Sequence, residues 1–585
     1  MNQEWSLDVL YKGFEDPKFT QDLEELGKKL DAYKAAVEKL PQMKEDPENA
    51  LETILKLQED YYLVSRRLMS FCSLSKSANT ANAQAASYLE RLHMALSNVS
   101  KENAMVKKFI AGVENLDELI EKNSFLSEYR FLLHETKQAA AHSLADEVED
   151  ILSKMDISGG SAWSNLQGYL TSAVEVEYDG KIITLSDVRN LANSPDAAVR
   201  KAAYEAELKC YDKIKDAVAF ALNSIKAQVN TESDLRGYES PLELTLERSR
   251  MKRETLDAMF TAIDEYLPKF HEYLKVKAQR LGYEKGLPWF EMRAPMGESK
   301  RQFTVEDAKE YLIAHFKPFA EDLAEMVERA FDEAWIDFYP RKGKVGGAFC
   351  SNMPFVGQSR VLTNFSGSMS SVVTLAHELG HAYHGQQLQD HRPLNTSYSM
   401  PVAETASTFN ENVILQAAVA ESEGEERLAI LEGQLQGTTQ IICDIYSRYL
   451  FETAVFEKRR TGFMFADELC GMMLDAQKKA YGDGLDHDWL HPYMWVNKSH
   501  YYSTGRSFYN FPYAFGGLFA GGLYAQYLEE GPSFVPKYRE MLKATTVSTV
   551  EDVAAMAGID ITKPDFWRKS LKLVADQIDL FVKGC

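Results

Sequence analysis

The feature that most constrains this chain is an H-E-x-x-H pattern at residues 377–381. On an α-helix, residues four apart lie on one face, so His377 and His381 can hold one zinc ion while Glu378 faces the attacking water. Glu404 lies one predicted helix later and can supply the third protein ligand. Three protein ligands leave the fourth zinc position open, which is typical of a catalytic site. The pattern therefore predicts a zinc peptidase with one zinc ion per chain.

The residues around the pattern favour the helix that it requires. At about 100° per residue, the apolar side chains lie on one stripe and the histidines on the opposite stripe. Ser368 or Ser370 can cap the start of this helix, and Gly385 is placed where it can end. The alternative is a surface helix with solvated histidines. The two stripes are Val372, Ala376, Leu379 and Tyr383 on the apolar side, and His377, His381 and His384 on the other.

A second helix is predicted to start at Pro401, a residue favoured in the first turn. Glu404 then lies in that turn, where the helix dipole favours a carboxylate. Glu411 shares its face and can orient a metal ligand by hydrogen bonding, although a solvated carboxylate is an equal alternative. His384 is interpreted either as a residue that supports the metal ligands from behind or as a buried histidine with its own partners.

Composition excludes several classes of partner. The net charge of −22 over 585 residues argues against nucleic acid, because phosphates would be repelled. The six cysteines are scattered, with no C-x-x-C pair, which is typical of a reducing compartment and argues against a cysteine-ligated zinc. The N-terminus lacks the pattern of a signal peptide. The expectation is a cytoplasmic protein that binds neither nucleic acid nor membrane.

One uncharged segment, residues 507–528, is long enough to span a bilayer. Its four glycines, Asn510, Pro512 and Gln526 favour a buried helix pair or an active-site wall instead. An aromatic cluster, residues 500–515, overlaps it. Such clusters usually belong to the core, but tyrosine hydroxyls and an imidazole are also what a peptidase needs near its oxyanion.

Helical patterns dominate the rest of the chain, including residues 23–40, 47–74 and 83–98. Alternating residues around Asp179-Gly180 predict a β-hairpin at 174–185. The predicted organisation is a helical N-terminal domain, residues 1–190, followed by a catalytic domain, residues 191–585.

Two short strands are predicted just before the metal helix, at residues 344–350 and 360–365. The edge of a small sheet beside the zinc can bind an extended peptide through backbone hydrogen bonds, which makes Gly347 and Ala348 candidate substrate-binding residues. A purely structural hairpin is the alternative.

Several of these segments together resemble the thimet-type oligopeptidase family, zinc metallopeptidase family M3, and its bacterial oligoendopeptidase F branch most closely. The resemblance is strongest from about residue 230 to the C-terminus, whereas the first 110 residues match only in helical character. The segments that carry it are 236–241, 347–349, 377–384, 404–407 and 507–513.

The resemblance implies a mostly α, gluzincin-type zincin body split by a deep substrate channel, with a small β-sheet beside the metal helix. It implies an endopeptidase acting on short unstructured peptides, with zinc on His377, His381 and Glu404 and with Glu378 as general base. It also implies that His500 and Tyr509 stabilise the oxyanion.

One tyrosine of the thimet branch has no counterpart in this chain, because Gly505 stands in its place. Tyr513 is a substitute for it as a substrate-binding residue.

Two alternatives stay open at this point. A helical zinc carboxypeptidase or dipeptidyl carboxypeptidase uses the same metal pattern but captures the substrate's C-terminal carboxylate with Arg or Lys, for which Arg506 is a candidate. A peptide-binding protein with a vestigial site is the alternative that is not an enzyme, and the intact Glu378 argues against it. The sequence leaves the cleavage preference and the oligomeric state open.

Overall fold

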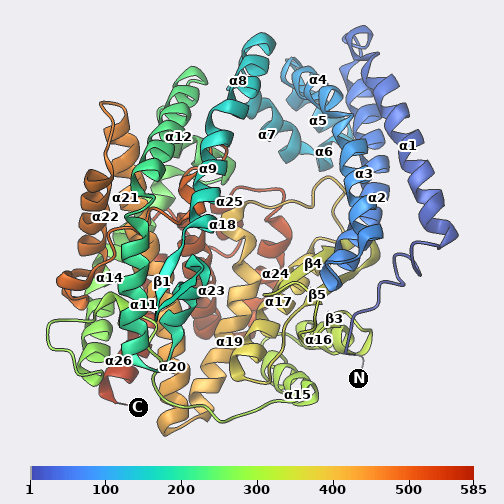
Figure 1. Ribbon diagram of the computed structural model, residues 1–585. Coiled ribbons are helices and arrows are strands. Elements are labelled where there is room, and N and C mark those ends of the chain that lie inside the picture. The colour runs from blue at the N-terminus through green and yellow to red at the C-terminus, as the bar shows by residue number, and fades with distance from the viewer. Residues whose placement is uncertain (1–2, 585) are drawn as a thin grey trace.

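The computed structural model describes residues 3–584 and shows a largely helical molecule with two lobes and a central part between them (Figure 1). The first lobe holds the N-terminal helices, drawn in blue on the right of the figure. Their bounds are α1 (Pro17–Val37), α2 (Pro47–Ala78), α3 (Ala83–Ser97), α4 (Ser100–Ala111), α5 (Leu116–Lys122), α6 (Ser124–Glu128) and α7 (Arg130–Ala140).

The second lobe, on the left of Figure 1, combines the middle of the chain with a later segment. Its helices are α8 (Asp146–Ser158), α9 (Gly160–Ala173), α10 (Leu185–Asn190), α11 (Ala197–Tyr211), α12 (Lys215–Leu235), α13 (Pro241–Arg248), α14 (Arg253–Arg280), α20 (Gly424–Thr439), α21 (Ile445–Arg459) and α22 (Ala466–Tyr481). The predicted hairpin is present as β1 (Val176–Tyr178) and β2 (Lys181–Ile183), which pair antiparallel.

The central part carries the H-E-x-x-H helix and the C-terminal helices. These are α15 (Val305–Phe316), α16 (Glu321–Asp332), α17 (Met369–Gln387), α18 (Met400–Ala403), α19 (Thr405–Glu421), α23 (Phe511–Glu530), α24 (Phe534–Ala544) and α25 (Val550–Ala555). The last helix, α26 (Pro564–Lys583), packs on α14 of the second lobe and on α23. Residues 507–528, for which a helix pair was one expectation, instead form a four-residue approach and most of one helix, α23. Among the described residues, no helix is both long enough and apolar enough to cross a membrane.

A small three-stranded sheet lies against α17. Its order is β3 (Ile336–Asp337), β5 (Gln358–Leu362), β4 (Phe349–Met353), with β3 parallel and β4 antiparallel to β5. Both predicted strands are therefore present but shifted, and residues 344–347 form a loop instead of strand. Two glycines of this loop, Gly346 and Gly347, explain the later start of the first strand, since glycine is unfavourable within a strand.

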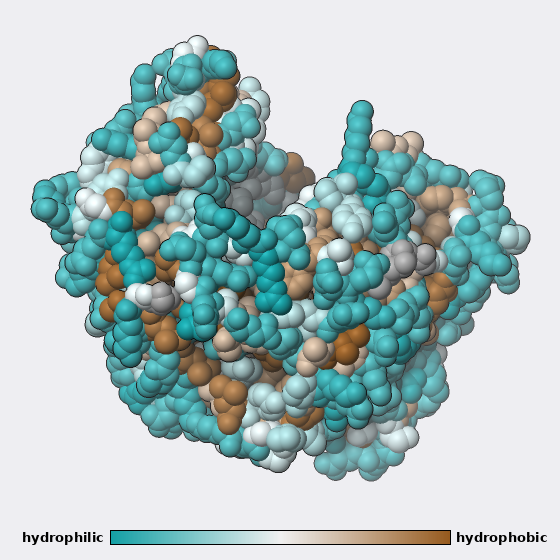
Figure 2. Space-filling model, turned by 90° about the horizontal axis from the view of Figure 1, so that it is seen from below, coloured by the Kyte–Doolittle hydropathy of each residue, from teal (hydrophilic) through white to brown (hydrophobic). Residues whose placement is uncertain are grey.

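The apolar side chains form two clusters. One joins α1–α7 with Met353 of β4, and the larger one runs from Val174 to Phe581. The space-filling view shows the surface hollowed between two lobes (Figure 2). This cleft agrees with the expected helical body split by a channel. The domain boundary at residue 190 remains a prediction.

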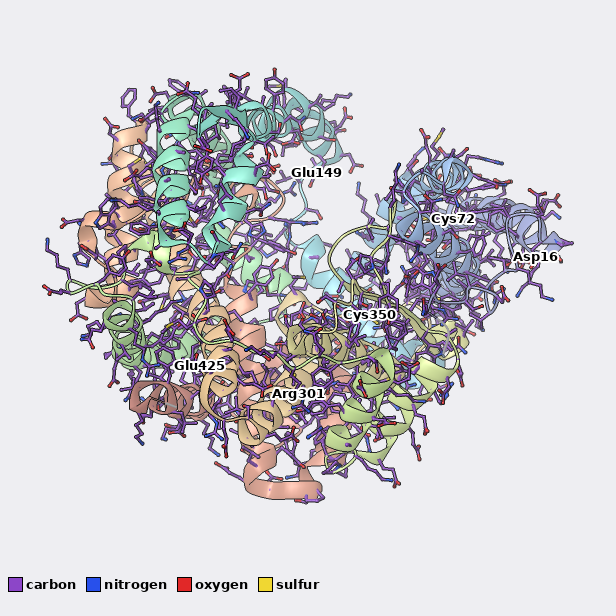
Figure 3. All side chains as sticks on the ribbon, turned by 60° about the horizontal axis from the view of Figure 1, so that its bottom comes forward. Asp16, Cys72, Glu149, Arg301, Cys350 and Glu425 are labelled. Atoms are coloured by element: carbon purple, nitrogen blue, oxygen red, sulfur yellow. The ribbon has the colours of Figure 1, made fainter. Side chains whose placement is uncertain are left out.

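Seen from below (Figure 3), Cys350 of β4 lies at the base of the gap between the lobe that carries Cys72 and the lobe that carries Glu149. Because β4 packs on α17, the helix that carries the H-E-x-x-H pattern lies at the base of this gap.

Candidate active site

Helix α17 presents the two histidines of the H-E-x-x-H pattern as the sequence predicts. Ser368 is its N-cap, and the Ser368 side chain accepts a hydrogen bond from the backbone N–H of Ser371 at 3.2 Å. The helix runs to Gln387, two residues beyond Gly385. Val372, Leu375, Ala376, Leu379 and Tyr383 are buried on its core side. The opposite face is thereby turned towards α19.

Glu404 comes from a break between two helices instead of from the first turn of one continuous helix. Pro401 does stand at the start of α18, but that helix ends at Ala403 and α19 begins at Thr405. The Ser407 hydroxyl donates to Glu404 Oε2 at 2.9 Å, which fixes the carboxylate at the start of α19. The break thus positions Glu404 opposite the histidines.

Three ligand atoms converge between α17 and α19. His377 Nε2 and His381 Nε2 lie 3.2 Å apart, and Glu404 Oε2 lies 3.2 Å from the first and 3.3 Å from the second. In the described part of the chain, these residues form the one group of His, Cys, Asp or Glu side chains placed to hold a metal ion. Two imidazole nitrogens and one carboxylate oxygen form a donor set that suits zinc.

The charges around the cluster match this chemistry. Burial lowers the pKa of His377, but contacts with Glu404 and Glu411 outweigh burial and raise that pKa to about 10. Burial raises the pKa of Glu404, and the two histidines more than offset this and hold it well below its usual value. The carboxylates of Glu404 and Glu411 therefore place negative charge beside the imidazole nitrogens, where a metal cation could replace the proton.

Glu411 contacts the far side of the first histidine. Its Oε1 lies against His377 Nδ1, which fixes the ring and leaves Nε2 facing the cluster. A contact of this kind can orient a metal ligand, and the orienting role of Glu411 remains a prediction.

Close helix packing holds the cluster together. A Cβ at Gly380 would lie 2.5 Å from Ala406 O and from Ser407 Cα, so only glycine allows α17 and α19 to approach this closely. On the other side of α17, Asn352 of β4 donates its Nδ2–H to His381 O at 3.0 Å. Asn352 was missed by the sequence analysis. The signal for it was Gly385, where any Cβ would meet the Asn352 amide.

Glu378 lies between the two histidine positions and is only 5% exposed. Burial raises the pKa of its carboxyl group, and the two histidines act in the opposite direction. A carboxylate with a raised pKa can take up a proton and release it again near neutral pH. The burial and charge of Glu378 therefore suit a general base.

The aromatic cluster predicted at residues 500–515, called the aromatic segment from here on, brings three predicted residues together beside the metal cluster. The ring centroids of His500 and Tyr509 lie 5.2 Å apart, and Tyr513 lies 6.2 and 6.0 Å from them. Tyr513 is near enough to Glu404 for the carboxylate to raise the pKa of its hydroxyl, after the effects of burial and Tyr509. One turn further along α23, a Cβ at Gly516 would lie 3.2 Å from Glu404 Cβ.

Tyr509 follows a residue with an unusual backbone. Phe508 has φ of +53°, which is rare for a bulky side chain and points to a structural or functional constraint. Its ring is buried against Phe456 and Tyr449. The Tyr509 hydroxyl lies 3.8 Å from Met400 Sδ and close to the Tyr513 hydroxyl, whose pKa it raises. The hydroxyl is thus held near the cluster without being engaged in the core.

The remaining predicted residues lie as follows. Gly347 is exposed just before β4, and Gly347 O accepts a hydrogen bond from Asn364 at 2.8 Å. Ala348 is half-buried beside it. Arg506 is exposed, with its guanidinium 5.3 Å from the centre of the Tyr509 ring.

His384 is fully buried and contacts α24, not the metal ligands. Its Nε2 lies 2.8 Å from Thr545 Oγ1 and 3.2 Å from Leu542 O, and its ring stacks on Tyr398. Burial lowers the pKa of this imidazole to about 3. Of the two interpretations offered by the sequence, the buried histidine describes these contacts.

The fold and the cluster define a class of protein. A helical body with H-E-x-x-H and a trailing Glu, all three ligands facing one point beneath a cleft, is the arrangement of a helical peptidase that uses a metal ion.

Comparison with known proteins identifies the family. The profile of Peptidase family M3 matches residues 190–573, and that of Oligopeptidase F matches residues 111–175. This chain belongs to peptidase family M3 and is an enzyme, a peptidase. It is 26% identical to oligopeptidase PepF of Bacillus subtilis (strain 168) over 526 residues, which are 88% of this chain and 78% of that protein.

Solved structures share the fold. A structure from Chlamydophila abortus superposes with a TM-score of 0.85 at 18% identity, covering 100% of this chain and 98% of that one. Oligoendopeptidase-F from Enterococcus faecium gives a TM-score of 0.71 at 20% identity, covering 97% and 99%. The expected fold class, a mostly α body with a small sheet, is therefore confirmed.

Proposed function

We propose that this chain is a zinc-dependent endopeptidase that hydrolyses internal bonds of short, unstructured oligopeptides. The observation that carries the proposal is the convergence of His377 Nε2, His381 Nε2 and Glu404 Oε2 within 4.8 Å of one another, with Glu378 buried beside them. These three residues would hold one zinc ion. When bound, zinc polarises the scissile carbonyl and lowers the pKa of water towards neutrality.

The protein's own residues perform the proton transfers and stabilise the developing charge. Glu378 accepts the proton of the attacking water and then passes it to the leaving amine. His500 and Tyr509 donate hydrogen bonds to the oxyanion. Glu411 keeps His377 in the orientation that presents Nε2, and Ser407 does the same for the Glu404 carboxylate.

Substrate binding follows from the position of the sheet. The edge strand β4, with Gly347 and Ala348 before it, lies beside α17 and offers backbone groups to an extended peptide. Tyr513, at the start of α23, lines the opposite side. A cleft with a metal site on its floor admits an extended strand and excludes a folded protein.

The cellular setting of the proposal is the cytoplasm. All five described cysteines, Cys72, Cys210, Cys350, Cys443 and Cys470, are free, and Cys585 lies outside the described residues. Free thiols support a reducing compartment. The proposed partners are peptides only.

Metal removal tests the proposal directly. A chelator should abolish cleavage of a fluorogenic peptide of about ten residues, and added zinc should restore it, while circular dichroism stays unchanged because a body this large does not depend on one ion. Glu404→Ala should lower zinc content by elemental analysis. Full activity in protein shown to contain no metal would contradict the proposal.

The cleavage sites decide between an endopeptidase and a carboxypeptidase. Mass spectrometry of a random peptide mixture should show cuts more than two residues from the C-terminus, and intact casein should resist cleavage. Products confined to the last one or two residues would favour a carboxypeptidase or dipeptidyl carboxypeptidase.

A further inference from the structure

A cavity of about 440 Å³ lies in the second lobe, between α10, α11 and α20. Cationic side chains are prominent on its wall: Arg189, Arg200, Arg293 and Lys498. Two carboxylates, Glu207 and Asp444, also line it. In a chain with a net charge of −22, a cavity with more cations than anions calls for an explanation.

Pairing within the protein accounts for only part of this charge. The paired groups are Arg200 with Glu291 at 3.1 Å, Arg189 with Glu207 at 3.2 Å, and Asp444 with Arg448. Among residues 3–584, Lys498 and Arg293 take part in no hydrogen bond or ion pair made by their side chains. The half-buried Lys498 and the exposed Arg293 are therefore left without a carboxylate in direct contact, although Asp444 acts on Lys498 at longer range.

Lys498 lies in unfavourable surroundings for a free cation. Burial and then repulsion from Arg448 outweigh the attraction of Asp444 and, with weaker repulsion from Arg189 and Arg293, lower the pKa of its ammonium group to about 8. A bound anion would relieve this repulsion, because an opposite charge favours the protonated form.

A histidine on the same wall supports the presence of a ligand. His491 is 1% exposed, and neither of its ring nitrogens has a hydrogen-bond partner. Its Nε2 lies 3.6 Å from Glu207 Oε1, beyond hydrogen-bonding reach. Buried polar groups in proteins nearly always have partners, so this imidazole lacks a group that a ligand in the cavity can supply.

The cavity lies next to the candidate active site. Lys498 is two residues from His500, on the same segment. Arg448 is close enough to Lys498, His500 and Tyr513 to influence the pKa of each. Tyr513 is in turn within the electrostatic reach of Glu404. The cations thus lie beyond the aromatic segment as seen from the metal cluster.

A second cavity lies between the metal cluster and the cations. A larger cavity of about 490 Å³ reaches from Glu411 to α20, where Gly433 and Gly437 line both cavities. A Cβ at either glycine would meet no atom within 4 Å. At these two positions no side chain of α20 separates the two cavities.

We propose that Lys498 and Arg293 bind the C-terminal carboxylate of the peptide substrate. The inference rests on the proposed function, because a peptidase substrate is what brings a carboxylate into the cleft. Every peptide carries this group at its end, whereas acidic side chains occur only in some sequences. Since Lys498 and the metal ligands are both fixed in the fold, the number of residues between the cut and the C-terminus is fixed as well.

Matched peptides test the proposal. One sequence of about ten residues is made as the free acid, as the C-terminal amide, and as an amide with Glu in the last position. We expect kcat/KM for the free acid to exceed that for the plain amide by about 10- to 100-fold, the range for one lost charge-assisted contact. Residues added at the N-terminus should leave the cut bond unchanged, and residues added at the C-terminus should move the cut by the same number.

Variants then assign the contact to these side chains. Lys498→Met and Arg293→Gln should each bring the ratio of free acid to amide close to one. Lys478→Met makes the same change of charge on an exposed, unpaired lysine of α22 and should keep the full ratio. Arg506→Gln tests the other arginine near the site and should also keep it.

Each outcome decides something. Equal kcat/KM for acid and amide in the wild type, or a ratio lost only in Arg506→Gln, overturns the inference. High activity on the amide with terminal Glu shows that a side-chain carboxylate serves as well as the chain end. If no peptide is cut with or without zinc, it is the proposed function that fails, and the two failures are thereby distinguished.

Discussion

The candidate metal cluster and the aromatic segment lie side by side but are held in place in different ways. His377, His381 and Glu404 come from two helices whose backbones touch at Gly380. His500 and Tyr509 come from an irregular segment, and the Tyr509 hydroxyl has Met400 Sδ, at 3.8 Å, and the Tyr513 hydroxyl as neighbours. The cluster is therefore rigid before any ligand arrives, whereas the aromatic groups have free hydrogen-bonding capacity for a reacting substrate.

The two groups are held differently because metal binding and oxyanion stabilisation make different demands on the side chains. Ligands for a metal must be preorganised, since small displacements weaken coordination. Donors for an oxyanion must stay unsatisfied until charge develops. Four expected outcomes would sharpen or break this comparison.

The largest effect should come from the general base. Glu378→Gln keeps the shape of the side chain but cannot accept a proton, so turnover should fall by about two to four powers of ten or more. Zinc content by elemental analysis and thermal stability should stay near wild type. Near-normal kcat with zinc bound would show that Glu378 is not the base.

The next effect tests the aromatic segment. Tyr509→Phe removes one donor and little volume, so kcat should fall by about two to three powers of ten with a smaller change in KM. Tyr538→Phe, which removes a buried hydroxyl without a partner, should leave kcat unchanged. An unchanged kcat for Tyr509→Phe would assign this residue to the core and break the comparison. His500→Ala should behave like Tyr509→Phe.

A third outcome tests the rigidity of the cluster. Gly380→Ala places a methyl group 2.5 Å from the α19 backbone and should lower the unfolding free energy by about 1–3 kcal/mol, as overpacking does. Zinc affinity should fall with it. Gly505→Ala, in the aromatic segment, meets no atom within 4 Å and should be nearly neutral in both measurements. Equal effects in urea unfolding would contradict the contrast.

The smallest effect concerns pH. His384 has its pKa lowered to about 3, so between pH 6.5 and 3 the unfolded chain binds more protons and stability falls as the pH falls. At pH 5 the loss should be about 2 kcal/mol relative to pH 7. His384→Gln should flatten this part of the stability curve, while His93→Gln, on the exposed face of α3, should not. Identical curves would show that His384 titrates normally.

The sequence by itself determined the helical fold class and the metal-binding pattern. The spacing of His377 and His381 fixes their common face, because helical geometry is local. Pro401 and Ser368 likewise marked helix starts. The strand predicted at residues 344–350 starts later, at Phe349, because the glycines of 344–347 disfavour a strand.

Only the tertiary structure decided which groups meet. The break at Glu404, the contact of Asn352 with His381 O, and the burial of His384 against α24 depend on segments far apart in the chain. The same holds for Lys498, Arg293 and His491, which no motif links. Packing of the helices brings such residues together. The energy of each contact depends on the neighbouring side chains in space, and the spacing of residues along the sequence does not specify those neighbours. The sequence thus determined which side chains are available for metal binding and catalysis, and the packing of helices distant in the chain determined how those side chains are arranged.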